Sequence, residues 1–286
     1  MKVSTEYTKK RILVTLDMTY IDSVLINYLV FLKEKFDIEH LVFFHNIWFN
    51  NAENGADILS KLDKPLVDIL EDKIKGEVKE YFSESEYSII VTESNNSAKE
   101  IKNIQKVENI DLTVFGKKTS VDDSGLIIER VLYNNSLSDI LVVPENAFHQ
   151  LENILVPVEF TKKSANTLIK SKALSEKIHA SLYCLHVFSI SNVYFPYLPI
   201  KDLKEQTLKK AKSEWEKHKK KYLESIEIPE IAFHFHANMS VSRSIYEYAI
   251  KEKTDIISIP EETSIMNTTL FQLLKMNMHL PILIMK

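Results

Sequence analysis

The feature that most constrains this sequence is an internal repeat that extends along its whole length. Four short apolar segments of the first half return in the same order in the second half, displaced by 141 to 144 residues. The matched pairs are Ile12–Asp17 with Ile154–Glu159, Leu41–His45 with Leu182–His186, Asp111–Phe115 with Asp255–Ile259, and Ile140–Val143 with Pro281–Ile284. Because the displacement is close to half of the 286 residues, the repeat predicts two copies of one domain, at 1–147 and 148–286.

Within each half, short apolar segments alternate with longer segments of helical periodicity. The short segments are continuously apolar, which is typical of strands in a parallel sheet that is covered on both faces. The expected strands are 11–16, 40–45, 87–92, 112–115 and 140–143, then 153–158, 181–187, 231–236, 256–259 and 282–285. The expected helices are 21–36, 57–83, 98–109 and 126–134, then 164–179, 202–224, 241–253 and 268–278. The fold class is therefore α/β, with two tandem doubly wound five-stranded parallel sheets.

The composition restricts the setting in which the chain works. A formal net charge of -4 gives no reason to expect a nucleic-acid-binding surface. The only cysteine, Cys184, lies in an apolar segment, so we expect a buried, unreactive thiol and no intramolecular disulfide. No segment reaches the roughly 18 apolar residues of a membrane helix, and the N-terminus has no apolar signal segment. We expect a cytoplasmic protein without membrane or nucleic-acid partners.

A doubly wound sheet binds ligands at the carboxyl ends of its strands, where the winding direction reverses. In a sheet wound from its first strand, this crevice lies between the first and fourth strands. The first half places Thr15, Leu16 and Asp17 at this position, and the second half places Val158 and Glu159 there.

The residues at these positions resemble the universal stress protein family. Domains of that family begin with a strand ending in Val-Pro-x-Asp, have a second strand ending in His-Val, and close with a glycine-rich loop, a helix and an apolar strand. The matching segments here are Val14–Asp17 and Val156–Glu159, then His45 and His186, then Leu141–Pro144 and Leu280–Ile284. The resemblance covers the chain twice and implies a Rossmann-like, adenine nucleotide alpha hydrolase-like fold with strand order 3-2-1-4-5.

Family members that bind ATP hold its phosphates in a loop of the form G-x2-G-x9-G-[S/T], and this loop departs from the pattern in both halves. The first half retains Gly116 and Gly125 but has Leu126 at the hydroxyl position. The second half has Pro260 at the first glycine, and no glycine follows Gly125. A phosphate nest needs unobstructed N–H groups and a positive φ, and proline has no N–H to donate. We therefore expect no ATP and no other cofactor.

Some elements of a ligand site remain in each half. In the second half Thr268 and Thr269 stand at the last glycine–hydroxyl pair. In the first half, a small ligand would lie between Asp17 and Gly116. An adenine-nucleotide sensor or slow ATP hydrolase that uses Asp17, Gly116 and Gly125 is the alternative function.

Several polar residues near the strand ends have both a structural and a functional interpretation. Asp17 and Glu159 either hold a ligand or cap the helix that follows. His45 and His186 end buried strands, where a histidine usually makes a hydrogen bond to the backbone.

Two further features of the sequence are candidate sites. His234 and His236 point to one face of a strand, but no third ligand lies at short spacing, so we expect no metal. The segment 193–199 has three aromatic residues and two prolines, and it either binds a partner or covers the sheet edge. The sequence has no P-loop, G-x-S-x-G, H-E-x-x-H or C-x-x-C motif, so we expect no catalytic residues and no enzyme activity.

The resemblance also implies how the halves associate. Single-domain members of the family usually dimerise through the last strand. This implies an intramolecular pseudo-dimer in which Leu141, Val142 and Val143 meet Ile282, Leu283 and Ile284. The expected function is a non-catalytic stress-response or regulatory protein that acts on protein partners, with homodimerisation of whole chains left open.

Overall fold

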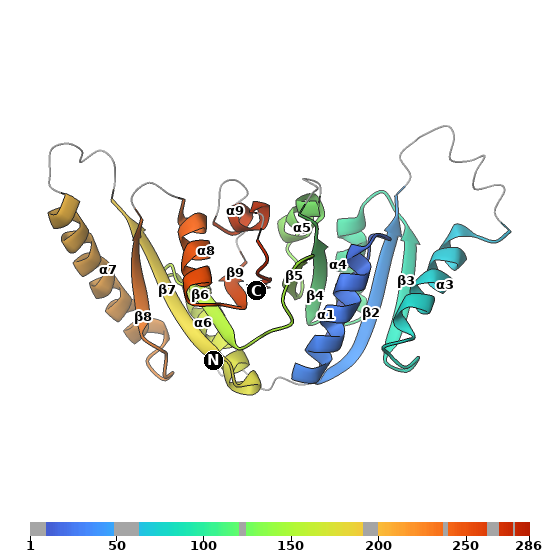
Figure 1. Cartoon of the computed structure of the whole chain (residues 1–286), viewed down its shortest axis with the longest axis horizontal. Helices are drawn as coiled ribbons and strands as arrows, with labels where there is room; N and C mark the ends of the chain where they lie inside the picture. Colours follow the sequence, from blue (N-terminus) through green and yellow to red (C-terminus); the bar gives the residue numbers. More distant parts are fainter. Residues whose placement is uncertain are drawn as a thin grey trace. The chain divides into compact units, whose positions relative to one another are not determined.

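The computed structural model describes residues 10–48, 63–119, 124–190, 200–236, 240–261, 269–276 and 278–286. The chain divides into two compact units, Met1–His149 and Gln150–Lys286 (Figure 1). The sequence repeat placed this boundary between residues 147 and 148.

The first unit is a five-stranded parallel sheet with strand order β3-β2-β1-β4-β5. Its strands are β1 (Lys10–Thr15), β2 (Ile38–Ile47), β3 (Tyr87–Glu93), β4 (Leu112–Lys117) and β5 (Asp139–Pro144). Their central residues are fully buried, among them Leu13, Val14, Phe43 and Val114. The predicted order 3-2-1-4-5 is confirmed.

Helices cover both faces of this sheet. They are α1 (Ile21–Lys35), α3 (Leu66–Val78), α4 (Ser97–Val107) and α5 (Ser124–Tyr133). Right-handed crossovers place α1 and α3 on one face and α4 and α5 on the other, and α4 packs against α5. Within the described residues, the expected helix 57–83 is shorter and begins directly after Pro65, since proline is favoured at the start of a helix.

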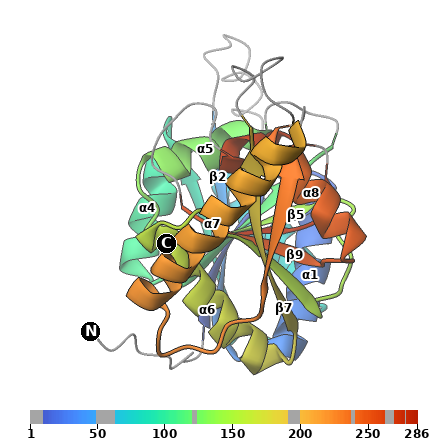
Figure 2. The ribbon, with the colours of Figure 1, turned by 90° about the vertical axis from the view of Figure 1, so that its left-hand side faces the viewer.

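The second unit repeats this arrangement with strand order β10-β9-β6-β7-β8. Its strands are β6 (Asn153–Pro157), β7 (Ser181–Ser189), β8 (Ile231–His236), β9 (Ile256–Pro260) and β10 (Ile282–Met285). Its helices are α6 (Lys162–Ile178), α7 (Ile200–Tyr222), α8 (Val241–Lys251) and α9 (Thr269–Lys275). In Figure 2, α7 lies in front of the strands of its unit, on which it buries Leu203, Ala211, Trp215 and His218.

Three further expectations concern the whole chain. Cys184 is a free, fully buried thiol in β7, and burial raises its pKa to about 12, which confirms the expected buried cysteine. Among the helices of the described residues, none combines the length and the apolar character that crossing a membrane requires. The pairing of Leu141–Val143 with Ile282–Ile284 stays a prediction.

Candidate functional site

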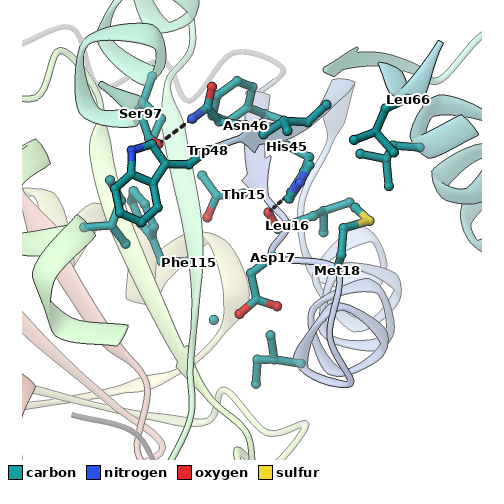
Figure 3. A pocket seen from close by; sticks show the side chains of 17 residues that line it. Thr15, Leu16, Asp17, Met18, His45, Asn46, Trp48, Leu66, Ser97 and Phe115 are labelled. Carbon is teal, nitrogen blue, oxygen red and sulfur yellow. Dashed lines mark hydrogen bonds between the residues drawn. The ribbon is translucent and has the colours of Figure 1, made fainter. Parts of the chain in front are cut away.

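The first unit contains a cavity of about 600 Å³ at the carboxyl ends of β1, β2 and β4 (Figure 3). This is the crevice that the winding of the sheet predicted. Four residues expected at the site line it together, namely Thr15, Leu16, Asp17 and Gly116. Side chains from α1, α3, α4 and α5 complete its walls.

The turn that leads from β1 into α1 is held by a buried carboxylate. Asp22, which is 2% exposed, accepts hydrogen bonds from the backbone N–H groups of Asp17 at 3.0 Å and Met18 at 2.8 Å. Burial is the main cause that raises the pKa of Asp22 to about 6. Met18 adopts a positive φ of 61°, a conformation that is uncommon for a residue other than glycine. Asp22 therefore fixes the backbone that positions Asp17 at the cavity.

Asp17 itself has local partners. Its Oδ1 accepts from the backbone N–H of Thr19 at 3.1 Å, and its Oδ2 pairs with Lys118 Nζ at 2.5 Å. Thr19 precedes the first residue of α1, so this bond closes the turn and does not cap the first turn of the helix. The carboxylate is about half exposed, so it remains open to a ligand.

The two matched histidines make the backbone hydrogen bonds that the sequence predicted. His45 Nδ1 donates to the carbonyl oxygen of Leu16 at 2.9 Å, and His186 Nδ1 donates to that of Val158 at 2.8 Å. Each bond joins a residue of the unit's second strand to the residue that directly follows the unit's first strand. The dashed line between His45 and Leu16 in Figure 3 marks the first of these bonds.

Gly116 is explained by packing and not by a positive φ. It lies within β4, opposite Val143 of β5. A Cβ at this position would lie 2.5 Å from Ile21 Cγ1, at the start of α1. Gly125, the other glycine of the predicted loop, lies in the first turn of α5. The close approach of α1 to β4 therefore accounts for the first glycine of the motif.

The corresponding cavity of the second unit is smaller, about 170 Å³. It brings together Val158, Glu159 and Thr269 beside Pro260, whereas Thr268 lies outside the described residues. The backbone N–H of Glu159 donates to Ser164 Oγ at 3.1 Å.

An aromatic cluster that sequence reasoning missed lies next to this second cavity. Phe160 has a positive φ of 57°, and its ring stacks on His186 with centroids 4.1 Å apart and planes inclined by 21°. Its centroid is 5.9 Å from those of Trp215 and His218 in α7. Burial lowers the pKa of His186 and of His218. The ring of Phe160 therefore packs against His186 and α7 next to the cavity, whose lining does not include it.

The remaining candidates have no ligand-holding geometry in the described parts of the chain. His234 packs against Tyr248, with ring centroids 6.2 Å apart. Both nitrogens of His236 are buried without a hydrogen-bond partner. No group of three or more histidine, cysteine, aspartate or glutamate residues suited to a metal occurs among the residues described. The aromatic segment 193–199 lies outside them.

Comparison with known proteins assigns the fold. No protein-family model and no curated protein matches the sequence. A universal stress protein from Archaeoglobus fulgidus DSM 4304 matches in structure with a TM-score of 0.63 and 15% identity, over 97% of this chain and 96% of that one. A functionally unknown protein from Pseudomonas aeruginosa PAO1 matches with a TM-score of 0.58 and 12% identity, over 98% and 93%. The tandem α/β fold of the whole chain is thus one that a universal stress protein has, as its motifs predicted.

Proposed function

We propose that the chain is a non-catalytic regulatory protein of the universal stress type, and that neither unit binds ATP. The shared fold supports the general class. The observation that carries the proposal is the chemistry of the first-unit cavity, whose described lining residues include no lysine or arginine. A triphosphate needs cationic side chains, a metal or several converging N–H groups to replace its hydration.

The second unit supports the same conclusion through size and backbone chemistry. Its cavity of about 170 Å³ is below the range of roughly 300–1,000 Å³ that is common for small-molecule sites. Pro260 ends β9 where the family has the first glycine of the phosphate loop, and it has no N–H to donate.

The absence of catalysis is part of the proposal. Asp17 is the only carboxylate among the residues that line the first cavity, and it is paired with Lys118. His45 uses Nδ1 to bind the Leu16 carbonyl, and no nucleophile among the described lining residues forms a hydrogen bond with it. Acid–base catalysis needs such positioned partners. We propose that the protein acts in the cytoplasm through protein partners, as an intramolecular pseudo-dimer.

The alternative function, an adenine-nucleotide sensor in the first unit, is favoured by one observation. The first-unit cavity has the volume of a small-molecule site, and it contains both Asp17 and Gly116. Slow ATP hydrolysis would use the same cavity.

Thermal unfolding with and without millimolar ATP and magnesium separates the two functions. A ligand at 100 times its dissociation constant adds about 2.7 kcal/mol to the free energy of unfolding. We expect no change in melting temperature, and no nucleotide released when the purified protein is denatured. An increase that Leu66→Asp abolishes and Val67→Asp preserves would establish the sensor, because Leu66 lines the cavity and its half-buried neighbour Val67 does not.

A further inference from the structure

We propose that the first-unit cavity binds a neutral, mainly apolar molecule that donates hydrogen bonds, such as an aromatic amine. This inference rests on the proposed function, because it takes the cavity to be a regulatory ligand site that does not hold ATP. It is carried by three properties of the cavity: its walls, its polar atoms and its charge.

The walls are largely apolar. Of the 17 residues that line the cavity, 11 have apolar or aromatic side chains. They come from elements far apart in the sequence, including Phe44 and Ile47 from β2, Leu66 and Leu70 from α3, and Ile127 from α5. Contact with such walls stabilises a ligand in proportion to the apolar surface that it removes from water.

Two polar side chains of the lining are left as acceptors, because the protein already uses their donors. The hydroxyl of Thr15 donates to the Val114 carbonyl at 3.1 Å, and His45 Nδ1 donates to the Leu16 carbonyl. Lone pairs therefore remain on Thr15 Oγ1 and, in a neutral ring, on His45 Nε2. A ligand that donates hydrogen bonds satisfies these lone pairs, whereas a ligand rich in acceptors does not.

The side-chain amide in the lining is also committed. Asn46 Nδ2 donates to the Ser94 carbonyl and to Ser97 Oγ, both at 2.8 Å, and Asn46 Oδ1 accepts from Thr92. Among the side chains of the described lining, the hydroxyl of Ser97 and the indole N–H of Trp48 are thus the donors that are not used by the hydrogen bonds named above.

The charge of the lining disfavours an anion. Asp17 is the only charged side chain among the residues that line the cavity, and Lys118 already neutralises it. A phosphate, carboxylate or sulfonate would lose its hydration here, and it would have to compete with Asp17 for Lys118; a buried unpaired charge is costly. A neutral ligand has no such penalty.

A tryptophan at the cavity favours a flat ligand. Trp48 lines the cavity but is 60% exposed. In Figure 3 its indole lies on the side of Ser97, across the cavity from Leu66. An aromatic molecule between these walls would cover the indole face, an arrangement that aromatic pairs prefer.

Two matched dyes test the proposal. N-phenyl-1-naphthylamine is neutral and has one N–H donor, and its fluorescence rises in apolar surroundings. 1-Anilinonaphthalene-8-sulfonate has the same rings and donor but adds a negative charge. We expect saturable binding of the neutral dye to the full chain, with an affinity at least about tenfold higher than that of the sulfonate. We also expect quenching of the emission of Trp48.

Substitutions on α3 test whether the dye binds in the first-unit cavity. Leu66→Lys, on the cavity wall, should weaken the binding of the neutral dye by about tenfold or more and strengthen the binding of the sulfonate. Val67→Lys changes the neighbouring half-buried position, which lies outside the lining. It should leave the affinities for both dyes unchanged. Circular dichroism of each variant serves to check that it is folded.

The outcomes separate this inference from the proposed function. If the sulfonate binds as tightly as the neutral dye, if Leu66→Lys and Val67→Lys behave alike, or if neither dye binds, the inference is wrong. In those cases the absence of a melting shift with ATP would leave the proposed function standing. If ATP raises the melting temperature and displaces the neutral dye, both are overturned.

Discussion

Replacing Asp22 by asparagine removes a buried charge from the turn that leads into the first-unit cavity. The carboxylate of Asp22 is 2% exposed and accepts the N–H groups of Asp17 and Met18. Asparagine has the same size and retains one accepting oxygen, but its other terminal atom is a donor. The substitution therefore removes one of the two hydrogen bonds, and it leaves no side chain at position 22 that can gain or lose a proton.

The pH dependence of stability gives the size of the effect. Burial raises the pKa of Asp22 from 3.8 to about 6 in the folded protein. Because the folded pKa is the higher one, the proton stabilises the folded state at low pH, and this contribution is lost as the pH rises from about 4 through 6. The whole shift corresponds to about 3 kcal/mol. The free energy of unfolding of the wild type, minus that of Asp22→Asn, should fall by about 2 kcal/mol between pH 4 and pH 7.

Urea denaturation at pH 4, 5, 6 and 7, followed by circular dichroism and tryptophan emission, measures this difference. Trp48 and Trp215 report on separate units, so the transition of each unit can be fitted by itself. Ser164→Ala is the matched control, because Ser164 accepts the N–H of Glu159 with a neutral hydroxyl at the same place in the second unit. Ser164→Ala should lower the free energy of unfolding by about 1 kcal/mol at every pH. If the difference in free energy of unfolding between the wild type and Asp22→Asn is also the same at every pH, the reasoning is refuted.

Two other substitution and labelling experiments address the packing of each unit. Gly116→Ala should destabilise the first unit by about 1–3 kcal/mol, because its Cβ would lie 2.5 Å from Ile21 Cγ1. Urea denaturation should show a smaller cost in an Ile21→Ala background, and additive costs would contradict the contact. Cys184 should not react with a thiol reagent at pH 7 in the native protein and should react once urea unfolds it, because burial raises its pKa to about 12. Rapid labelling of the native protein would show that β7 opens.

Most of the fold could be predicted because its strongest signals are local and occur twice. The strands of a sheet covered on both faces must be continuously apolar, so 153–158 and 282–285 stand out from the amphipathic helices around them. Helix ends were less certain because they depend on caps. For example, α4 begins at Ser97, where the side chain of Asn96 accepts the N–H of Lys99.

The candidate site was predictable only where topology alone decides it. The winding order of the strands brings Asp17 and Gly116 to one crevice, and this does not depend on the conformation of their side chains. The wall residue Leu66 lies far from both in the sequence, and no pattern connects it to them. The role of Asp22 also depends on the backbone conformation of the turn, which directs the N–H groups of Asp17 and Met18 toward its carboxylate. One signal could have indicated it: Asp22 and Ser164, which are 142 residues apart, are polar acceptors at the same place in the repeat.

The side chain at one position of this shared turn lies differently with respect to the two cavities. Met18 and Phe160 are also 142 residues apart, and both adopt a positive φ near 60°. Such a conformation costs a non-glycine residue on the order of 1 kcal/mol or more. Since it occurs in both units, the turn from the first strand into the first helix imposes it, and only the side chain is free to vary. Methionine lines an open cavity of about 600 Å³, whereas phenylalanine stacks on His186 beside a cavity of about 170 Å³. The repeat thus places methionine in the lining of the larger cavity, and it places an aromatic ring outside the lining of the smaller one.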